Sequence, residues 1–354
     1  MADKVLMKGN EALAEAAIRV GCKHFFGYPI TPQTELAAYM AKKMPKIGGT
    51  YLQAESEVSA INMVLGAASA GVRAMTSSSS PGISLKSEGI SYLAGSDLPA
   101  LIINVQRGGP GLGGIQPSQA DYWQATKGLA HGDFHVLVFA PSTVQEMVDT
   151  VANAFSLADE YRVPAMILAD GMLGQMMEPV VLPEKIEYKA EKPWAANGHK
   201  NEREHNIINS LYLKPQLLED KIIERFERYA DIKAKHQMAE EYLTEDADLT
   251  IVAYGASSRV ARSAVNKARE MGLKVGLLRP ITLWPFPEKA VEKSAEQSEQ
   301  LLVVEMSMGQ MVDDVKLSAN GKAKVKFYGR TGGIIPTPNE ILEQIKTLMG
   351  KVEK

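Results

Sequence analysis

Residues 57–71 read Glu-Val-Ser-Ala-Ile-Asn-Met-Val-Leu-Gly-Ala-Ala-Ser-Ala-Gly. The stretch is apolar and rich in small residues, which predicts a closely packed helix over residues 57–70. Glu57 is the one charged residue in it. Because a carboxylate that faces an otherwise apolar surface costs several kcal/mol unless it is paired or protonated, we expect Glu57 to have a partner.

The segments around this helix alternate between short β-rich runs and helical patterns. Such alternation is typical of an α/β fold with a mostly parallel sheet. The strands predicted before residue 180 are 24–27, 50–53, 74–76, 99–105, 135–139 and 164–169. The helices predicted there are 11–20, 33–43, 57–70, one that ends near residue 93, and 143–159.

The composition divides the rest of the chain into two parts. We expect a first domain over residues 1–185, a charged helical connector over 186–246 and a second α/β domain over 247–354. The connector contains a predicted helix over 215–242, which is either a solvated link or a surface that docks a partner subunit. The elements predicted in the second domain are strands 249–254, 274–278, 301–305 and 325–328 and helices 257–271 and 339–349.

Length and composition limit the class of protein. With 354 residues, two domains are the reasonable expectation. The net charge of −3 argues against nucleic acid as the main partner. A single cysteine, Cys22, excludes an internal disulfide and an iron–sulfur cluster held by this chain alone. We expect a cytoplasmic protein, because no run approaches the roughly 20 apolar residues of a membrane span.

Three polar elements directly follow predicted strands. They are Thr31 in the segment 28–32 (Tyr-Pro-Ile-Thr-Pro), the serine-rich turn 77–82 and Arg107. In open α/β sheets, ligands bind beyond the carboxyl ends of the strands. We therefore expect these three elements to line one crevice, with the start of the Glu57 helix nearby.

The chain resembles the α subunit of the 2-oxoacid:ferredoxin (flavodoxin) oxidoreductases, and in size it is nearest to the 2-oxoisovalerate and 2-oxoglutarate types. The resemblance covers nearly the whole chain, and its motifs are specific only when taken together. In one of them the chain departs from its relatives, which often have Ser-Gly-Pro-Gly where residues 79–82 are Ser-Ser-Pro-Gly. The motifs are Gly-Tyr-Pro-Ile-Thr-Pro32, Glu57 with Gly66-Ala-Ala, Asn-Val-Gln-Arg107-Gly-Gly-Pro-Gly and Tyr328-Gly-Arg-Thr-Gly-Gly333.

The resemblance implies a fold and a reaction. The fold would be a parallel-sheet domain of the type that binds the pyrimidine of thiamine diphosphate, followed by an α/β domain like the C-terminal domain of transketolase. The reaction would be the oxidative decarboxylation of a 2-oxoacid with coenzyme A to acyl-CoA and CO₂, with electrons passed to ferredoxin. A branched-chain acid, 2-oxoisovalerate, is favoured as the substrate, and 2-oxoglutarate comes next.

The resemblance also implies roles for individual residues. Glu57 would hydrogen-bond N1′ of the aminopyrimidine ring and so activate the cofactor. Arg107 would hold the substrate carboxylate as a charge-assisted pair, and Thr31 would add a hydroxyl. The other residues expected to bind the cofactor are Tyr28, Pro29 and Ser80.

Structural explanations stand beside these roles. A Glu in the first turn of a helix often acts only as a cap or a dipole partner. Arg107 could form a structural ion pair, Thr31 could be a helix N-cap, and Tyr28 could pack in the core. Asp121 and Lys127 are expected at the surface.

No metal site is expected on this chain. Thiamine diphosphate enzymes hold the diphosphate and its metal with a Gly-Asp-Gly segment and a downstream Asn. This chain matches that motif only in part, in residues 169–174, Ala-Asp-Gly-Met-Leu-Gly. The resemblance implies a partner β subunit that supplies Mg²⁺ and the diphosphate site, and a γ subunit and a ferredoxin-like δ subunit, with the iron–sulfur clusters on partner subunits. Two alternatives stay open, the β subunit of a lipoamide-linked 2-oxoacid dehydrogenase and a non-enzymatic α/β binding module.

Overall fold

The computed structural model describes residues 4–188 and 191–350. Its larger sheet has seven strands in the order β12-β6-β7-β5-β4-β2-β3, all parallel except β12. The central strands are buried along their whole length, which explains why they appear in the sequence as continuous apolar runs. The strands are β2 His24–Gly27, β3 Thr50–Gln53, β4 Ala74–Ser78, β5 Leu101–Gln106, β6 Leu137–Phe139, β7 Ala165–Asp170 and β12 Thr282–Trp284.

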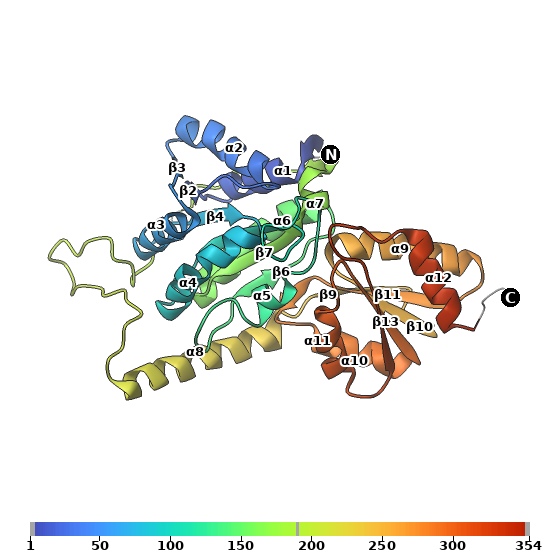
Figure 1. Ribbon diagram of the computed structural model, residues 1–354. Helices are drawn as coiled ribbons and strands as arrows, with labels where there is room; N and C mark the ends of the chain where they lie inside the picture. Colours follow the sequence, from blue (N-terminus) through green and yellow to red (C-terminus); the bar gives the residue numbers. More distant parts are fainter. Residues whose placement is uncertain (1–3, 189–190, 351–354) are drawn as a thin grey trace.

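Helices connect these strands in the manner of an open α/β sheet. Figure 1 shows this unit in blue to green, beside the second unit in orange to red. Two further strands, β1 Lys4–Lys8 and β8 Met177–Val181, form an antiparallel pair. The helices are α1 Gly9–Arg19, α2 Thr34–Lys43, the 3₁₀ helix η1 Met44–Ile47, α3 Glu57–Ser69, α4 Ser80–Gly95, α5 Tyr122–Thr126, α6 Val144–Tyr161 and α7 Gly171–Gln175.

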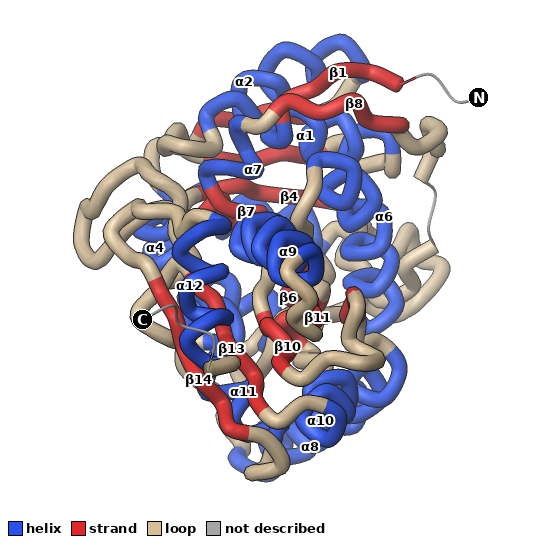
Figure 2. Tube along the Cα trace, turned by 90° about the vertical axis from the view of Figure 1, so that its right-hand side faces the viewer, coloured by secondary structure: helices blue, strands red, loops and turns tan. Residues whose placement is uncertain are grey.

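The second sheet has five strands in the order β14-β13-β10-β11-β9, and only β9 runs antiparallel to its neighbour. Figure 2 shows β10, β13 and β14 together, with β1 and β8 at the opposite end of the molecule. The strands are β9 Ala239–Tyr242, β10 Leu249–Val252, β11 Val275–Pro280, β13 Gln300–Glu305 and β14 Lys324–Gly329. The helices of this unit are α9 Gly255–Glu270, α10 Glu288–Gln297, α11 Met311–Ala319 and α12 Pro338–Leu348.

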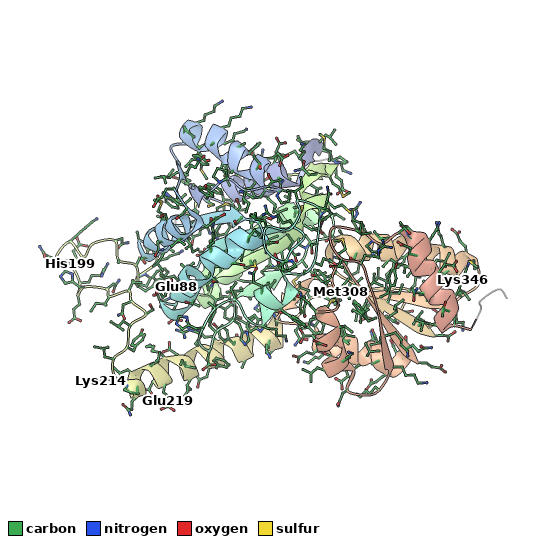
Figure 3. The ribbon with its side chains drawn as sticks, viewed as in Figure 1. Glu88, His199, Lys214, Glu219, Met308 and Lys346 are labelled. Carbon is green, nitrogen blue, oxygen red and sulfur yellow. The ribbon has the colours of Figure 1, made fainter. Side chains whose placement is uncertain are left out.

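The segment between the units ends differently from the prediction. Its helix, α8, spans Pro215–Lys235, and the expected continuation to residue 242 is wrong because residues 239–242 form β9. Glu240 of β9 forms ion pairs with Arg262 and Arg279 of the second unit, so tertiary contacts prevail over helix propensity here. Before α8, the chain extends away from the body and returns, with His199 in the extended part and Lys214 where α8 begins (Figure 3).

Aromatic packing joins the connecting helix to both units. The Tyr229 hydroxyl of α8 donates a hydrogen bond to the His135 carbonyl oxygen over 3.0 Å. The His135 ring stacks on Trp284 of β12, with 4.5 Å between ring centroids. Because β12 pairs with β6, a strand from the second half of the chain completes the edge of the first sheet.

The expected α/β architecture is confirmed: a unit built on a mostly parallel sheet is followed by a second α/β unit. Several short elements were not predicted, among them β1, β8, β12, α5, α7, α10 and α11. Among the described residues, no helix combines the length and the apolar character that crossing a membrane requires.

Candidate active site

The order of strands brings the predicted polar elements together. Strands β5, β4, β2 and β3 are consecutive neighbours in the larger sheet. Their carboxyl ends therefore lie along one edge, where the turn 28–32, the serine-rich turn 77–82 and Arg107 follow β2, β4 and β5. Helix α3 begins a few residues after β3, which places Glu57 at the same edge.

Glu57 is buried between a hydroxyl and an ammonium group. Its side chain is only 3% exposed. Ser78, the last residue of β4, donates a hydrogen bond to Oε1 over 2.6 Å, and the Nζ of Lys86 forms an ion pair with Oε2. The capping explanation does not apply, because the N-cap of α3 is Ser56, which accepts a hydrogen bond from the backbone of Ser59.

Lys86 is the site residue that the sequence analysis missed. It lies in α4, is fully buried and has its charge directed at Glu57. Burial lowers the pKa of the Lys86 ammonium group, and the Glu57 carboxylate in contact with it acts in the opposite direction by favouring the charged form. The signal in the sequence was a lysine that shares one helical face with Gly82 and Gly89, four residues before it and three after it.

Two glycines of α4 allow this helix to approach α3. A Cβ atom on Gly82 would lie 2.3 Å from Oε1 of Glu57 and 2.0 Å from Oγ of Ser78. A Cβ on Gly89 would lie 2.4 Å from the side chain of Ile61. The Pro-Gly step of the serine-rich turn is therefore required by the position of the Glu57 carboxylate.

The serines of the turn hold neighbouring loops in place. Ser77 donates to Oε1 of Gln33 over 2.6 Å, and Ser80 donates to Oδ2 of Asp121 over the same distance. The Ser80 hydroxyl also accepts a hydrogen bond from the backbone N–H of Arg107, 3.0 Å away. Ser80 is thus engaged within the protein.

The expectation that Asp121 lies at the surface is wrong, whereas Lys127 is exposed as expected. The Asp121 carboxylate is bound by Ser80 and by the amide nitrogen of Asn104, which lies 2.9 Å away. Burial raises the pKa of Asp121 above its usual range. Ala120, Tyr122 and Trp123 flank Asp121 in a stretch without regular periodicity, so the sequence carried no sign of this contact.

Arg107 and Thr31 lie in direct contact. The Arg107 Nη1 donates to the Thr31 carbonyl oxygen over 2.9 Å, and Nη2 donates to the Leu112 carbonyl oxygen over 3.1 Å. Arg107 is only 9% exposed, and its Nε has no hydrogen-bond partner within the described residues. No carboxylate of those residues pairs with the guanidinium, so they do not provide the structural ion pair that was the alternative role for Arg107.

Thr31, Tyr28 and Pro29 lie on the exposed rim of this edge. Thr31 is not an N-cap, because the N-cap position of α2 belongs to Gln33. Tyr28 is 39% exposed, which excludes core packing, and its carbonyl oxygen accepts a hydrogen bond from Gln33 over 3.3 Å. The rim thus consists of a hydroxyl, an aromatic ring and a proline beside a buried carboxylate and a guanidinium.

Asp170, the acidic residue of the segment 169–174, has a structural role. Its Oδ1 accepts hydrogen bonds from the backbone N–H groups of Met172 and Leu173, so it is the N-cap of α7. Burial raises its pKa to about 6. The residues that the structure describes contain no group of three or more His, Cys, Asp or Glu side chains placed to hold a metal ion.

Comparisons with known protein families match both units. Residues 15–254 match the thiamine diphosphate-binding family of pyruvate flavodoxin/ferredoxin oxidoreductase, and residues 247–341 match core domain II of pyruvate:ferredoxin oxidoreductase. The ketoisovalerate oxidoreductase subunit VorB of Methanothermobacter marburgensis is 48% identical over 347 residues, 98% of each chain. The 2-oxoglutarate synthase subunit KorA of Methanothermobacter thermautotrophicus is 38% identical and covers 98% of this chain and 99% of its own.

Two solved structures are similar to this chain in fold. The 2-oxoglutarate:ferredoxin oxidoreductase from Magnetococcus marinus, solved with 2-oxoglutarate, coenzyme A and succinyl-CoA, matches with a TM-score of 0.85 and 28% identity. The match covers 98% of this chain and 65% of that one. A split-gene transketolase shares the fold, with a TM-score of 0.60 and 14% identity. The chain belongs to the pyruvate flavodoxin/ferredoxin oxidoreductase family, the thiamine diphosphate-dependent oxidoreductases of 2-oxoacids.

Proposed function

We propose that this chain is the α subunit of a 2-oxoacid:ferredoxin oxidoreductase that oxidises a branched-chain 2-oxoacid, with 2-oxoisovalerate as the favoured substrate. The complex would convert the acid and coenzyme A to acyl-CoA and CO₂ and pass the electrons to ferredoxin. The observation that carries the proposal is the buried Glu57 carboxylate at the carboxyl edge of a sheet that matches the thiamine diphosphate-binding family. The family match favours this reaction over the lipoamide-linked alternative and over a non-enzymatic module.

The residues at this edge fit the aminopyrimidine end of thiamine diphosphate. Glu57 is a single buried carboxylate, and Gly82 leaves its Oε1 side free of a Cβ that would crowd it. When bound, the cofactor supplies the electron sink for decarboxylation. The Glu57 carboxyl group would form a hydrogen bond with the ring nitrogen N1′. Tyr28 and Pro29 would line the pocket at its rim.

Ser80 would act on the cofactor pocket indirectly. Its hydroxyl is engaged by Asp121 and by the backbone of Arg107. Ser80 therefore joins the β4–α4 turn to the start of the Arg107 loop, and its removal would disturb both walls of the pocket.

Arg107 and Thr31 would bind the substrate carboxylate. The guanidinium has two N–H groups tied to carbonyl oxygens and, within the described residues, a free buried Nε and no counter-ion. An anion that reaches this group would form charge-assisted hydrogen bonds, which are shorter and stronger than neutral ones. The exposed Thr31 side chain would add a hydroxyl to the same carboxylate.

The relatives support the choice of substrate. The VorB subunit, which shares 48% of its residues with this chain, belongs by name to a ketoisovalerate oxidoreductase, and the KorA subunit, at 38%, to a 2-oxoglutarate synthase. The larger share of identical residues favours the branched-chain acid. 2-Oxoglutarate stays the second choice.

Partner subunits would complete the enzyme. We assign the diphosphate and Mg²⁺ site to a β subunit, and the iron–sulfur relay to partner chains that include γ and ferredoxin-like δ subunits. The one cysteine, Cys22, is buried, and a [4Fe–4S] cluster takes four thiolates. A chain without disulfides suits a reducing cytoplasm, which is the location we propose.

The experiment is an anaerobic purification by a tag on this chain, followed by an assay of coenzyme A-dependent viologen reduction with a panel of 2-oxoacids. We expect iron-bearing partners to co-purify and 2-oxoisovalerate to give the highest kcat/KM. A preference for 2-oxoglutarate would replace the branched-chain assignment. An iron-free complex that is inactive with every acid would contradict the proposed function.

A further inference from the structure

The face of α4 that meets α3 carries one charged residue among glycines. Gly82 and Gly89 let the two helices approach, and Lys86 lies between them. The Lys86 side chain is fully buried, whereas Glu88, two residues on, is exposed and hydrogen-bonded to Tyr92 (Figure 3). A lysine at such a position costs free energy unless its charge is paired.

Glu57 is the partner that the structure gives to this ammonium group. The ion pair with Oε2 is the one interaction of Nζ among the described residues. The other charged groups that follow β5 have their own partners, Arg107 the carbonyl oxygens of Thr31 and Leu112, and Asp121 the hydroxyl of Ser80. Within the part of the chain that the structure describes, Glu57 is thus the one charged partner of Lys86.

The two carboxylate oxygens of Glu57 contact side chains from two different elements. Ser78 of β4 donates to Oε1, and Lys86 of α4 binds Oε2. A buried carboxylate without a counter-ion tends to take up a proton, because the charged form loses its hydration. An ammonium group in contact has the opposite effect, since it favours the ionised acid.

We propose that Lys86 is a positioning residue that keeps Glu57 ionised and fixes the direction of its carboxylate before thiamine diphosphate binds. This inference rests on the proposed function for the identity of the cofactor. An ionised Glu57 can only accept hydrogen bonds, whereas a protonated Glu57 could donate one. Lys86 would therefore determine which partner of the Glu57–N1′ hydrogen bond contributes the proton.

The first test is the infrared spectrum of the assembled complex at pH 7 after removal of thiamine diphosphate. In Lys86→Met, which keeps the length of the side chain and removes the charge, we expect a new carbonyl band of a protonated carboxyl group. The band should shift with ¹³C-glutamate labelling and vanish in Lys86→Met/Glu57→Gln. Glu88→Gln is the control, because it removes an exposed carboxylate from the same helix and should produce no such band.

Two results would overturn the inference. One is a Lys86→Met complex without the new band, and the other is a wild-type complex that already has such a band and loses it in Glu57→Gln. If Lys86→Met does not assemble, Lys86→Gln carries the same expectations.

The second test separates this inference from the proposed function. Calorimetry compares the binding of thiamine diphosphate with that of an analogue in which C–H replaces N1′. In buffers of different ionisation enthalpy, the wild-type complex should take up a proton on binding the natural cofactor but not on binding the analogue, because an ionised Glu57 and an unprotonated N1′ are both acceptors. Lys86→Met should bind the natural cofactor without this uptake, and an unchanged uptake would count against Lys86. If Glu57→Gln still takes up the proton on binding the natural cofactor, the proposed role of Glu57 fails, and the infrared result alone decides on Lys86.

Discussion

The Arg107 guanidinium lies against the backbone of Thr31, with 2.9 Å between Nη1 and the carbonyl oxygen. This hydrogen bond joins the loop that follows β5 to the turn that follows β2, across the carboxyl end of β4. A second bond, to the Leu112 carbonyl oxygen, fixes the fold of the loop itself. Arg107 therefore shapes the rim of the site and also supplies to it a positive charge that pairs with no carboxylate of residues 4–188 and 191–350.

Replacing Arg107 tests the proposed binding of the substrate carboxylate. A charge-assisted hydrogen bond contributes about 1.5–3 kcal/mol, so Arg107→Ala should raise the KM for the 2-oxoacid by roughly 10- to 100-fold. Arg107→Lys should recover only part of this loss, because an ammonium group cannot reach both carbonyl oxygens and the substrate. Steady-state kinetics of the assembled complex provide the measurement, and an unchanged KM in Arg107→Ala would remove this residue from substrate binding.

Gly82 gives a steric test of the position of Glu57. The added methyl group of Gly82→Ala would lie 2.3 Å from Oε1 and must displace the carboxylate, so we expect a loss of turnover of about 10²-fold, as for a lost acid–base group. Gly66→Ala in α3 is the matched control, because a Cβ there meets nothing within 4 Å. The control should keep full activity and gain up to about 1 kcal/mol of stability. Equal activities for the two variants would show that the carboxylate tolerates displacement.

The lowered pKa of His135 predicts that the folded protein loses stability in acid. Burial, and then the charges of Lys233 and Lys127, lower its pKa from 6.5 to about 4. Below pH 6.5 the unfolded chain takes up a proton at this position and the folded chain does not, so folding stability falls as the pH drops from 6.5 to 4. We expect a loss of about 2 kcal/mol, a value that allows for the partial exposure of the ring.

The measurement is the melting temperature of the complex between pH 4 and pH 7. His135→Phe keeps the stacking on Trp284 and should flatten this part of the profile. His131→Gln, an exposed change in the same loop, should leave the profile as it is in the wild type. A profile of His135→Phe that matches the wild type would assign the acid sensitivity to other groups.

The sequence predicted the central strands well because burial on both faces gives them a pattern that needs no tertiary information. β5 and β7, predicted at 99–105 and 164–169, span Leu101–Gln106 and Ala165–Asp170, and α3 begins at Glu57 as expected. β9 and β12 were missed because their strand character comes from distant partners. Residues 239–242 pair with β11, and residues 282–284 pair with β6, some 140 positions earlier in the chain.

The same limit applies to the site. Glu57 was recognisable because a lone carboxylate in an apolar helix requires a partner, but the identity of that partner depends on how α4 packs against α3. Lys86 lies 29 positions away from Glu57 in the sequence (86 − 57), in a segment where a lysine ordinarily reaches solvent. The sequence predicted that Arg107 and Thr31 lie close together. Only the structure could show that the guanidinium binds the Thr31 backbone carbonyl oxygen.

The most direct test of the central claim, that Glu57 serves the cofactor, is the turnover of Glu57→Gln in the assembled complex saturated with thiamine diphosphate. Gln preserves the shape of the side chain and removes the acid, so we predict a loss of about 10²-fold or more in kcat with the subunits still associated. Glu88→Gln, the exposed change on α4, should keep wild-type turnover. Near-wild-type turnover of Glu57→Gln would contradict the account.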